Sequence, residues 1–304
     1  MKRIVILAFV TSLLLALFLW LRPVIASRGR PTLPNVAGRP SKPVADGSAG
    51  GSVSQTPSGS TIGPAVPRPG PADAAQAGVT HSDEIEAAIL DLVNQERAIA
   101  KVKPLQRDDT LQNTARNHCD DMLLRNYFSH DDPDGFSPTD RISEAHRQLI
   151  GLTGENIWMG VNIDLSDQKK TAALIVADLM RSTRHKENIL NKDYTHIGIG
   201  VAIKGRDIKA TQNFANIVAL TRQAVPLQVH GGESLDLTAQ PVGAGQAPDQ
   251  FEFFSLDEGM AVGGPQLIAG ASVPGPAAVP AGIYKLRFLF PQGSAYWGPR
   301  VEVK

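Results

Sequence analysis

The stretch "HIGIGVAI", residues 196–203, decides the fold class of this chain. Bulky β-branched residues alternate in it with small ones, and the small ones are Gly198, Gly200 and Ala202. A period of two predicts a strand with one apolar face and one nearly bare face. The bare face allows a helix or a ligand to approach the backbone closely.

The residues around this strand predict a layered domain. A partner strand fits residues 207–220, and four segments with helical spacing precede the pair at 82–99, 109–126, 138–148 and 168–181. Helices followed by strands, without βαβ alternation, favour an α+β domain over residues 82–222. Ser182 and Thr183 precede a further short helix, in which Ser182 is expected to be the N-cap and to orient His185.

The composition and the spacing of apolar residues change after Pro226. Short apolar runs such as "YKLRFLF", residues 284–290, are separated by Gly and Pro clusters. Several short strands in about 80 residues predict a small all-β, sandwich-like domain at 226–304. It shows no catalytic constellation and is interpreted as an accessory or adhesion module.

The N-terminus predicts export. Residues 4–21 are almost wholly apolar and follow Lys2 and Arg3. The segment 1–26 is either a signal peptide, cut after small residues at Val24 and Ala26, or a membrane anchor, because about 18 apolar residues is the lower limit for crossing a bilayer. The protein is therefore expected to be secreted, periplasmic or anchored at the outer face of the cytoplasmic membrane.

Residues 27–81 are dominated by Pro, Gly, Ser and Ala. They offer almost no large side chain to bury, which predicts a disordered linker.

The bulk composition excludes some functions. Lys plus Arg and Asp plus Glu each total 30, so the formal net charge is zero, which argues against a nucleic-acid binder. The single cysteine, Cys119, cannot form an internal disulfide and is interpreted, with His118 beside it, as a core residue of the helix at 109–126.

The stretch "RNYFSHDDPDG", residues 125–135, places His130 before a run of acids. The histidine could be a metal ligand, a base or a turn residue. A calcium loop with His130 at its first position would need a glutamate at its twelfth, and that position is Arg141. No H-E-x-x-H run is present either.

Six segments resemble one known family. They are "LVNQER", "FSHDDPDG", "GENIWMG", "MRSTRHKENIL", "HIGIGVAI" and "TQNFA". In this order and at these spacings, residues 85–220 resemble the bacterial branch of the CAP superfamily, which contains cysteine-rich secretory proteins and plant pathogenesis-related proteins. The resemblance implies an α-β-α sandwich with a surface cavity lined by two histidines and two acids that can hold a divalent metal.

Carried over to this sequence, the resemblance implies four metal ligands. The histidines match His130 and His185, and the acid of "GENI" matches Glu155. The second acid has no clear match, and Asp134 is the nearest carboxylate. A further departure is Leu179, where the family usually has Trp. Two imidazoles with one or two carboxylates suit Zn²⁺, and three protein ligands would leave a position open for water or substrate.

Three functions remain open from the sequence. The first is an exported binding module whose cavity takes a divalent metal, or a small ligand such as a lipid or another envelope component. The second is a metal-dependent, peptidase-like hydrolase in which Glu155 is the base for a metal-bound water. The third is a structural or adhesive envelope protein with a vestigial site.

Overall fold

The computed structural model describes residues 69–275 and 278–304. The predicted signal peptide or anchor at 1–26, with its apolar run at 4–21, and residues 27–68 of the predicted linker lie outside these ranges. Within them, no helix is both long and apolar enough to cross a membrane.

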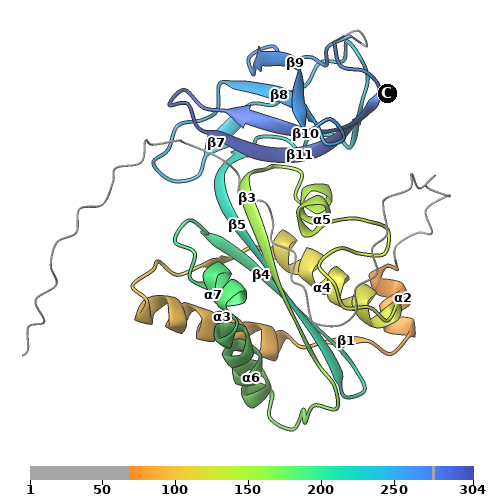
Figure 1. Cartoon of the computed structure of the whole chain (residues 1–304), viewed down its shortest axis with the longest axis vertical. Coiled ribbons are helices and arrows are strands. Elements are labelled where there is room, and N and C mark those ends of the chain that lie inside the picture. The colour runs from red at the N-terminus through yellow and green to blue at the C-terminus, as the bar shows by residue number, and fades with distance from the viewer. Residues whose placement is uncertain (1–68, 276–277) are drawn as a thin grey trace, which may run out of the picture. The chain divides into compact units, whose positions relative to one another are not determined.

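Three long antiparallel strands form the centre of the first domain (Figure 1). β4 (His196–Lys204) and β5 (Asp207–Thr221) are joined by a tight turn at Gly205, whose φ of 64° lies in the left-handed region that glycine tolerates. β3 (Leu149–Gly160) pairs with the other edge of β5. The β4–β5 pair confirms the sequence prediction, whereas β3 was not predicted.

Three helices cover one face of this sheet: α3 (Asp83–Ile99), α6 (Gln168–Arg181) and α7 (Thr183–Ile189). One apolar cluster joins them to the strands, with Ile89 of α3 and Ile175 of α6 fully buried in it. α6 has the predicted bounds.

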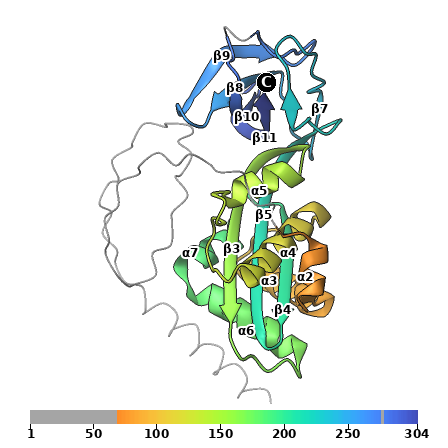
Figure 2. The same cartoon turned by 90° about the vertical axis from the view of Figure 1, so that its right-hand side faces the viewer.

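The opposite face is covered chiefly by α4 (Asp109–Leu124), with α5 (Pro138–Ala145) and α2 (Pro71–Gln76) beside it. The α-β-α sandwich is therefore confirmed, and Figure 2 shows the layers from the side. The bare face of β4 is what admits α4, because a Cβ at Gly198 or Gly200 would collide with the α4 backbone.

Side-chain caps fix the starts of most of these helices. Ser82 accepts a hydrogen bond from the amide of Ile85, and Asp108 accepts one from the amide of Leu111. Ser182 is the N-cap residue of α7, as predicted, but its side chain makes no cap hydrogen bond.

The predicted linker ends earlier than residue 81. α2 and β1 (Thr80–His81) belong to the folded domain, since Thr80 pairs with Ile203 of β4. Ala74 and Val79 are buried against α4. These two small apolar residues are enough to fasten the segment, which composition alone had assigned to the linker. β2 (Gln106–Arg107) also pairs with β4, but in parallel, whereas β1 is antiparallel to it.

The C-terminal region is all-β, as predicted. Its antiparallel strands, in spatial order, are β11 (Ala295–Val303), β10 (Gly282–Leu289), β8 (Gln250–Ser255) and β9 (Met260–Leu267). Two shorter strands accompany them: β6 (Gln228–Val229) pairs with β11, and β7 (Ala239–Pro241) pairs with β5.

The core of this region continues into the first domain. Phe251, Phe253 and Phe288 are fully buried in it, together with Ile150 of β3 and Ala219 of β5. β11 also pairs with β3, where Trp297 lies opposite Gly151. The apolar cluster therefore crosses the predicted domain boundary near residue 225.

Candidate functional site

The loop that follows α4 carries His130. Asn126 turns the chain out of the helix with a φ of 53°, a conformation that Asn tolerates better than most residues. The buried Asp132 then organises the loop, because its Oδ1 accepts hydrogen bonds from the amides of Asp134 (3.0 Å) and Phe136 (2.8 Å). These bonds hold His130 in a fixed turn over the sheet.

His130 lies against Glu155 of β3. The imidazole Nδ1 is 2.8 Å from Glu155 Oε1. The side chain of His130 is 30% exposed, whereas that of Glu155 is only 2% exposed. Because an ionised carboxylate only accepts hydrogen bonds, Nδ1 is the donor and must carry a proton. The structure therefore brings together two of the four predicted site residues.

Arg141 of α5 connects the loop to the buried acid. One guanidinium nitrogen donates to the carbonyls of His130 and Phe136, both at 2.8 Å, and the other donates to Glu155 Oε2 at 2.8 Å. Arg141 itself is buried. In the sequence Arg141 serves only to exclude a calcium loop, whereas in the structure it fixes both the loop backbone and the acid of the site.

Glu155 is ionised in this setting. Burial alone would raise the pKa of its carboxyl, but the hydrogen bond from His130 and the charges around it, including that of Arg141, hold the pKa below its ordinary value. The Asn213 amide also lies 3.2 Å from Oε2 and donates to it when its nitrogen faces the acid. Both carboxylate oxygens are thus occupied by donors from the protein.

His118 of α4 lies behind the pair, with Nε2 4.0 Å from Glu155 Oε1. Burial lowers the pKa of His118 to about 4, despite the opposing effect of Glu155, so the ring is neutral at neutral pH. Its Nε2 donates to the carbonyl of Ser129 at 3.1 Å and so supports the His130 loop. The prediction that His118 and Cys119 are core residues is confirmed.

Asp134 is directed elsewhere. Its Oδ2 accepts a hydrogen bond from Arg125 at 2.7 Å, and Arg125 also binds Asp121 of α4. Among the described residues, no hydrogen bond or ion pair joins Asp134 to His130 or Glu155. The structure therefore does not bring the candidate fourth ligand to the site.

His185 lies on α7, half-buried, on the other side of β3 from α4. Its backbone carbonyl accepts a hydrogen bond from Asn156 at 3.1 Å. Asn188 extends this connection, because it donates to the side chain of Asn156 at 2.8 Å and to the carbonyl of Glu155 at 3.2 Å. The two asparagines thus fix the position of α7 relative to the strand that carries Glu155.

The arrangement does not fit the predicted four-ligand metal site. In the part of the chain that the structure describes, no three His, Cys, Asp or Glu side chains are grouped so as to hold a metal ion. Both oxygens of Glu155 are engaged by donors, and Asp134 is bound to Arg125. The set does match one known feature of metal sites, a histidine whose second ring nitrogen is held by a carboxylate.

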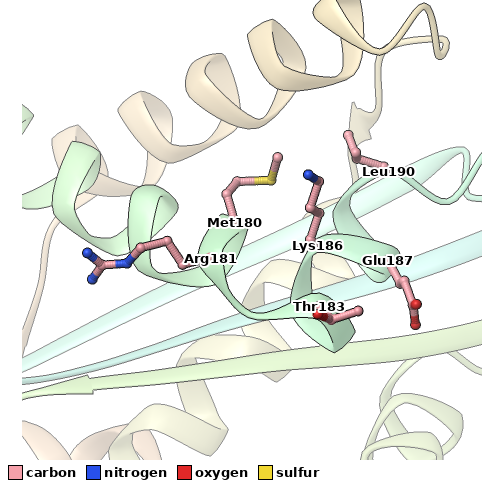
Figure 3. A pocket seen from close by; sticks show the side chains of 6 residues that line it. All are labelled: Met180, Arg181, Thr183, Lys186, Glu187 and Leu190. Carbon is pink, nitrogen blue, oxygen red and sulfur yellow. The ribbon is translucent and has the colours of Figure 1, made fainter.

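A surface pocket of about 550 Å³ lies elsewhere, where α6 meets α7. Figure 3 shows that Met180 and Lys186 point to the same side of these helices. The residues that line it are Met180, Arg181, Thr183, Lys186, Glu187 and Leu190. None of the four predicted site residues lines this pocket, so it is distinct from the His130–Glu155 centre.

Comparison with known protein families finds a match in this domain. Residues 90–214 match the cysteine-rich secretory protein family, CAP. This segment is a CAP domain. The matched range contains His130, Glu155 and His185 as well as β3, β4 and the first part of β5, so the family resemblance seen in the sequence is confirmed.

Two proteins of Bacillus subtilis (strain 168) are similar to this CAP domain. YkwD is 38% identical over 120 residues, which are 40% of this chain and 43% of YkwD. The membrane protein YlbC is 35% identical over 129 residues, which are 42% of this chain and 34% of YlbC. The chain thus spans less than half the length of either relative.

Solved structures with a similar domain include an extracellular SCP-domain protein of Bacillus anthracis str. Ames, 28% identical, with a TM-score of 0.37 over 51% of this chain and 45% of that one. An outer surface protein of Borrelia burgdorferi is 20% identical, with a TM-score of 0.40 over 45% of this chain and 98% of that one.

Proposed function

We propose that this chain is an exported binding protein of the cell envelope, and that His130 is the residue of its CAP domain that contacts the ligand. One observation carries the proposal: the buried Glu155–Arg141 ion pair holds Nδ1 of His130 while the ring stays partly exposed. The second ring nitrogen, Nε2, can then accept a hydrogen bond or bind a metal ion. The ligand class is a small molecule, a lipid or another envelope component.

Two observations support the location. The apolar run at residues 4–21 follows a basic start, which is typical of export. The relative YlbC is described as a membrane protein. The N-terminal sequence of the mature protein tests this part, because cleavage after residue 26 indicates secretion and retention of residues 4–21 indicates an anchor.

Zinc is the metal we propose for this site, with a smaller ligand set than the sequence implied. His130 and His185 would be ligands, and Glu155 would orient His130 rather than bind the ion. A bound zinc ion would act as a Lewis acid toward a ligand oxygen. We assign Glu155 the orienting role because both of its oxygens already accept hydrogen bonds from His130 and Arg141.

Calorimetric titration of the full chain with zinc tests this assignment. We expect binding that is abolished in His130→Ala and His185→Ala and weakened about 10- to 100-fold in Glu155→Gln, the usual loss for a residue that orients a ligand. Asp134→Asn is the matched control and should bind zinc normally. A wild type that does not bind zinc would contradict the metal proposal, and a loss in Asp134→Asn would contradict the reduced ligand set.

A hydrolase is the second candidate, because a histidine held by a buried carboxylate is also the arrangement of a general base. In that case His130 and not Glu155 would be the base. Among the described residues, no hydroxyl or thiol forms a hydrogen bond with the His130 ring, so the nucleophile would be water. Turnover of peptide, ester or peptidoglycan substrates that is lost in His130→Ala would favour this function over binding alone.

A further inference from the structure

One face of the C-terminal sheet gathers positive charge and aromatic rings. The side chains concerned alternate with the core residues of β8, β10 and β11, so they lie on the face opposite to the apolar core. We call this the cationic face, and it consists of Glu252, Phe254, Lys285, Arg287, Trp297 and Arg300.

Two of its three cations have carboxylate partners. Arg287 forms an ion pair with Glu252. Arg300 lies 3.9 Å from Asp140 at the start of α5. The side chains of Arg287 and Arg300 are 33% and 21% exposed, so both reach solvent at the rim of the face.

Lys285 is the third cation and has no such partner. The residue is only 8% exposed, and within residues 69–275 and 278–304 its ammonium forms no hydrogen bond or ion pair. The ammonium lies over the Trp297 ring, 5.5 Å from Nζ to the ring centroid. Three cations thus share two carboxylates, and the cation without one belongs to the most buried of the three residues.

This unmatched charge is unfavourable as it stands. An ammonium on a buried side chain without a counter-charge is destabilising, and the cation–π contact with Trp297 offsets only part of that cost. Burial lowers the pKa of Lys285 to about 8, with Asp140 opposing the shift and Arg300 adding to it. The amine therefore still carries its proton at pH 7, and an anion would be stabilised beside it.

We propose that the cationic face binds an oxyanion, a phosphate or carboxylate group, through Lys285, with Arg287 and Arg300 at its rim. The anion supplies the charge that Lys285 lacks within the fold. Its source is a polymer or small molecule that carries such groups. The proposal does not depend on the function of the CAP domain, because none of its residues touches His130 or Glu155.

The test is a thermal-shift and calorimetric titration of the full chain with sodium phosphate, and separately with sodium acetate, against sodium chloride at equal ionic strength. We expect saturable stabilisation by at least one oxyanion in the wild type. A response to phosphate alone would indicate a phosphate group in the natural ligand, and a response to acetate alone a carboxylate.

Lys285→Met removes the charge and keeps much of the volume. We expect it to be more stable than the wild type without oxyanion, and to bind about 10-fold or more weakly, as loss of a charged hydrogen bond implies. Lys285→Arg should retain binding, and the exposed Lys304→Met is the matched control. Should Lys285→Met fail to fold, the Lys285 Nζ signal in an NMR titration of the wild type replaces it.

Two results would overturn the proposal. One is a wild type whose stability and Lys285 Nζ signal respond to neither oxyanion beyond the chloride control. The other is an equal response in wild type and Lys285→Met, which would assign binding to another surface.

Discussion

Glu155 in the CAP domain and Lys285 in the C-terminal sheet are both buried charges, but their surroundings are opposite. Glu155 receives hydrogen bonds from His130 and Arg141 and has the Asn213 amide beside it. Lys285 has an aromatic ring and no counter-charge within hydrogen-bond distance among the described residues. Glu155 has its counter-charge and hydrogen-bond donors within the protein, and it therefore positions His130. Lys285 has no such counter-charge in the part of the chain that the structure describes, and we therefore expect it to bind an anion from outside.

The largest expected effect on stability comes from removing Arg141, the ion-pair partner of Glu155. Arg141→Met should destabilise the protein by about 3–5 kcal/mol, because it leaves a buried carboxylate without its ion-pair partner. Urea unfolding measures this loss, and adding Glu155→Gln should recover part of it. The exposed Arg181→Met should change stability by less than about 0.5 kcal/mol. A loss of less than about 1 kcal/mol in the free energy of unfolding of Arg141→Met would show that the Arg141–Glu155 ion pair does not stabilise the site.

His118 should make the stability of the protein depend on pH in the acid range. Its pKa is about 4 in the fold against 6.5 for an ordinary histidine, so between these values the unfolded chain binds a proton that the folded chain does not. Stability should therefore fall by up to about 3 kcal/mol as the pH drops from 6.5 to 4.

Urea unfolding at several pH values, in buffer with a chelator, tests whether His118 causes this loss of stability. In His118→Gln this part of the pH profile should be flat. A slope equal to that of the wild type would assign the acid sensitivity to other groups, Glu155 among them, whose lowered pKa acts in the same direction at lower pH.

Lys285 should make the stability of the protein depend on pH in the alkaline range. Its pKa is about 8 in the fold against 10.5 for an ordinary lysine, so the unfolded chain again binds more protons between these values. This group alone should raise stability by up to about 3 kcal/mol from pH 8 to 10.5. The difference between wild type and Lys285→Met, measured without phosphate, isolates it; a difference that does not change with pH would contradict the buried, unpaired amine.

The smallest effect is expected at Asp134. Its ion pair with Arg125 is partly exposed, and such pairs contribute about 0–1 kcal/mol. Asp134→Asn should therefore lower stability by no more than about 1 kcal/mol in urea unfolding. A larger loss would mean that Asp134 supports the His130 loop more than its contacts indicate.

Patterns local in sequence predicted much of the fold. The alternation in residues 196–203 predicted both β4 and the close approach of a layer to its bare face, and helical spacing predicted α3, α4 and α6. β3 was missed because both of its faces are covered, so polar residues such as Glu155 and Asn156 are buried in it and no alternation appears.

The site was predictable only in part. The family resemblance indicated His130 and Glu155, which the structure places in contact. The roles of Arg141 and Asn213 could not be found, because they meet Glu155 from α5 and β5 only after folding. Asp134 was chosen as the nearest carboxylate in sequence, and the Asp132 turn that follows His130 directs it to Arg125 instead.

NMR of the full chain with ¹⁵N-labelled histidine reports the protonation of each ring nitrogen. It therefore tests whether ionised Glu155 fixes His130 through Nδ1. We predict a proton on Nδ1 of His130 at neutral pH in the wild type, and loss of this preference in Glu155→Gln. A His130 ring with Nδ1 unprotonated, or an unchanged ring in Glu155→Gln, would show that Glu155 does not fix His130.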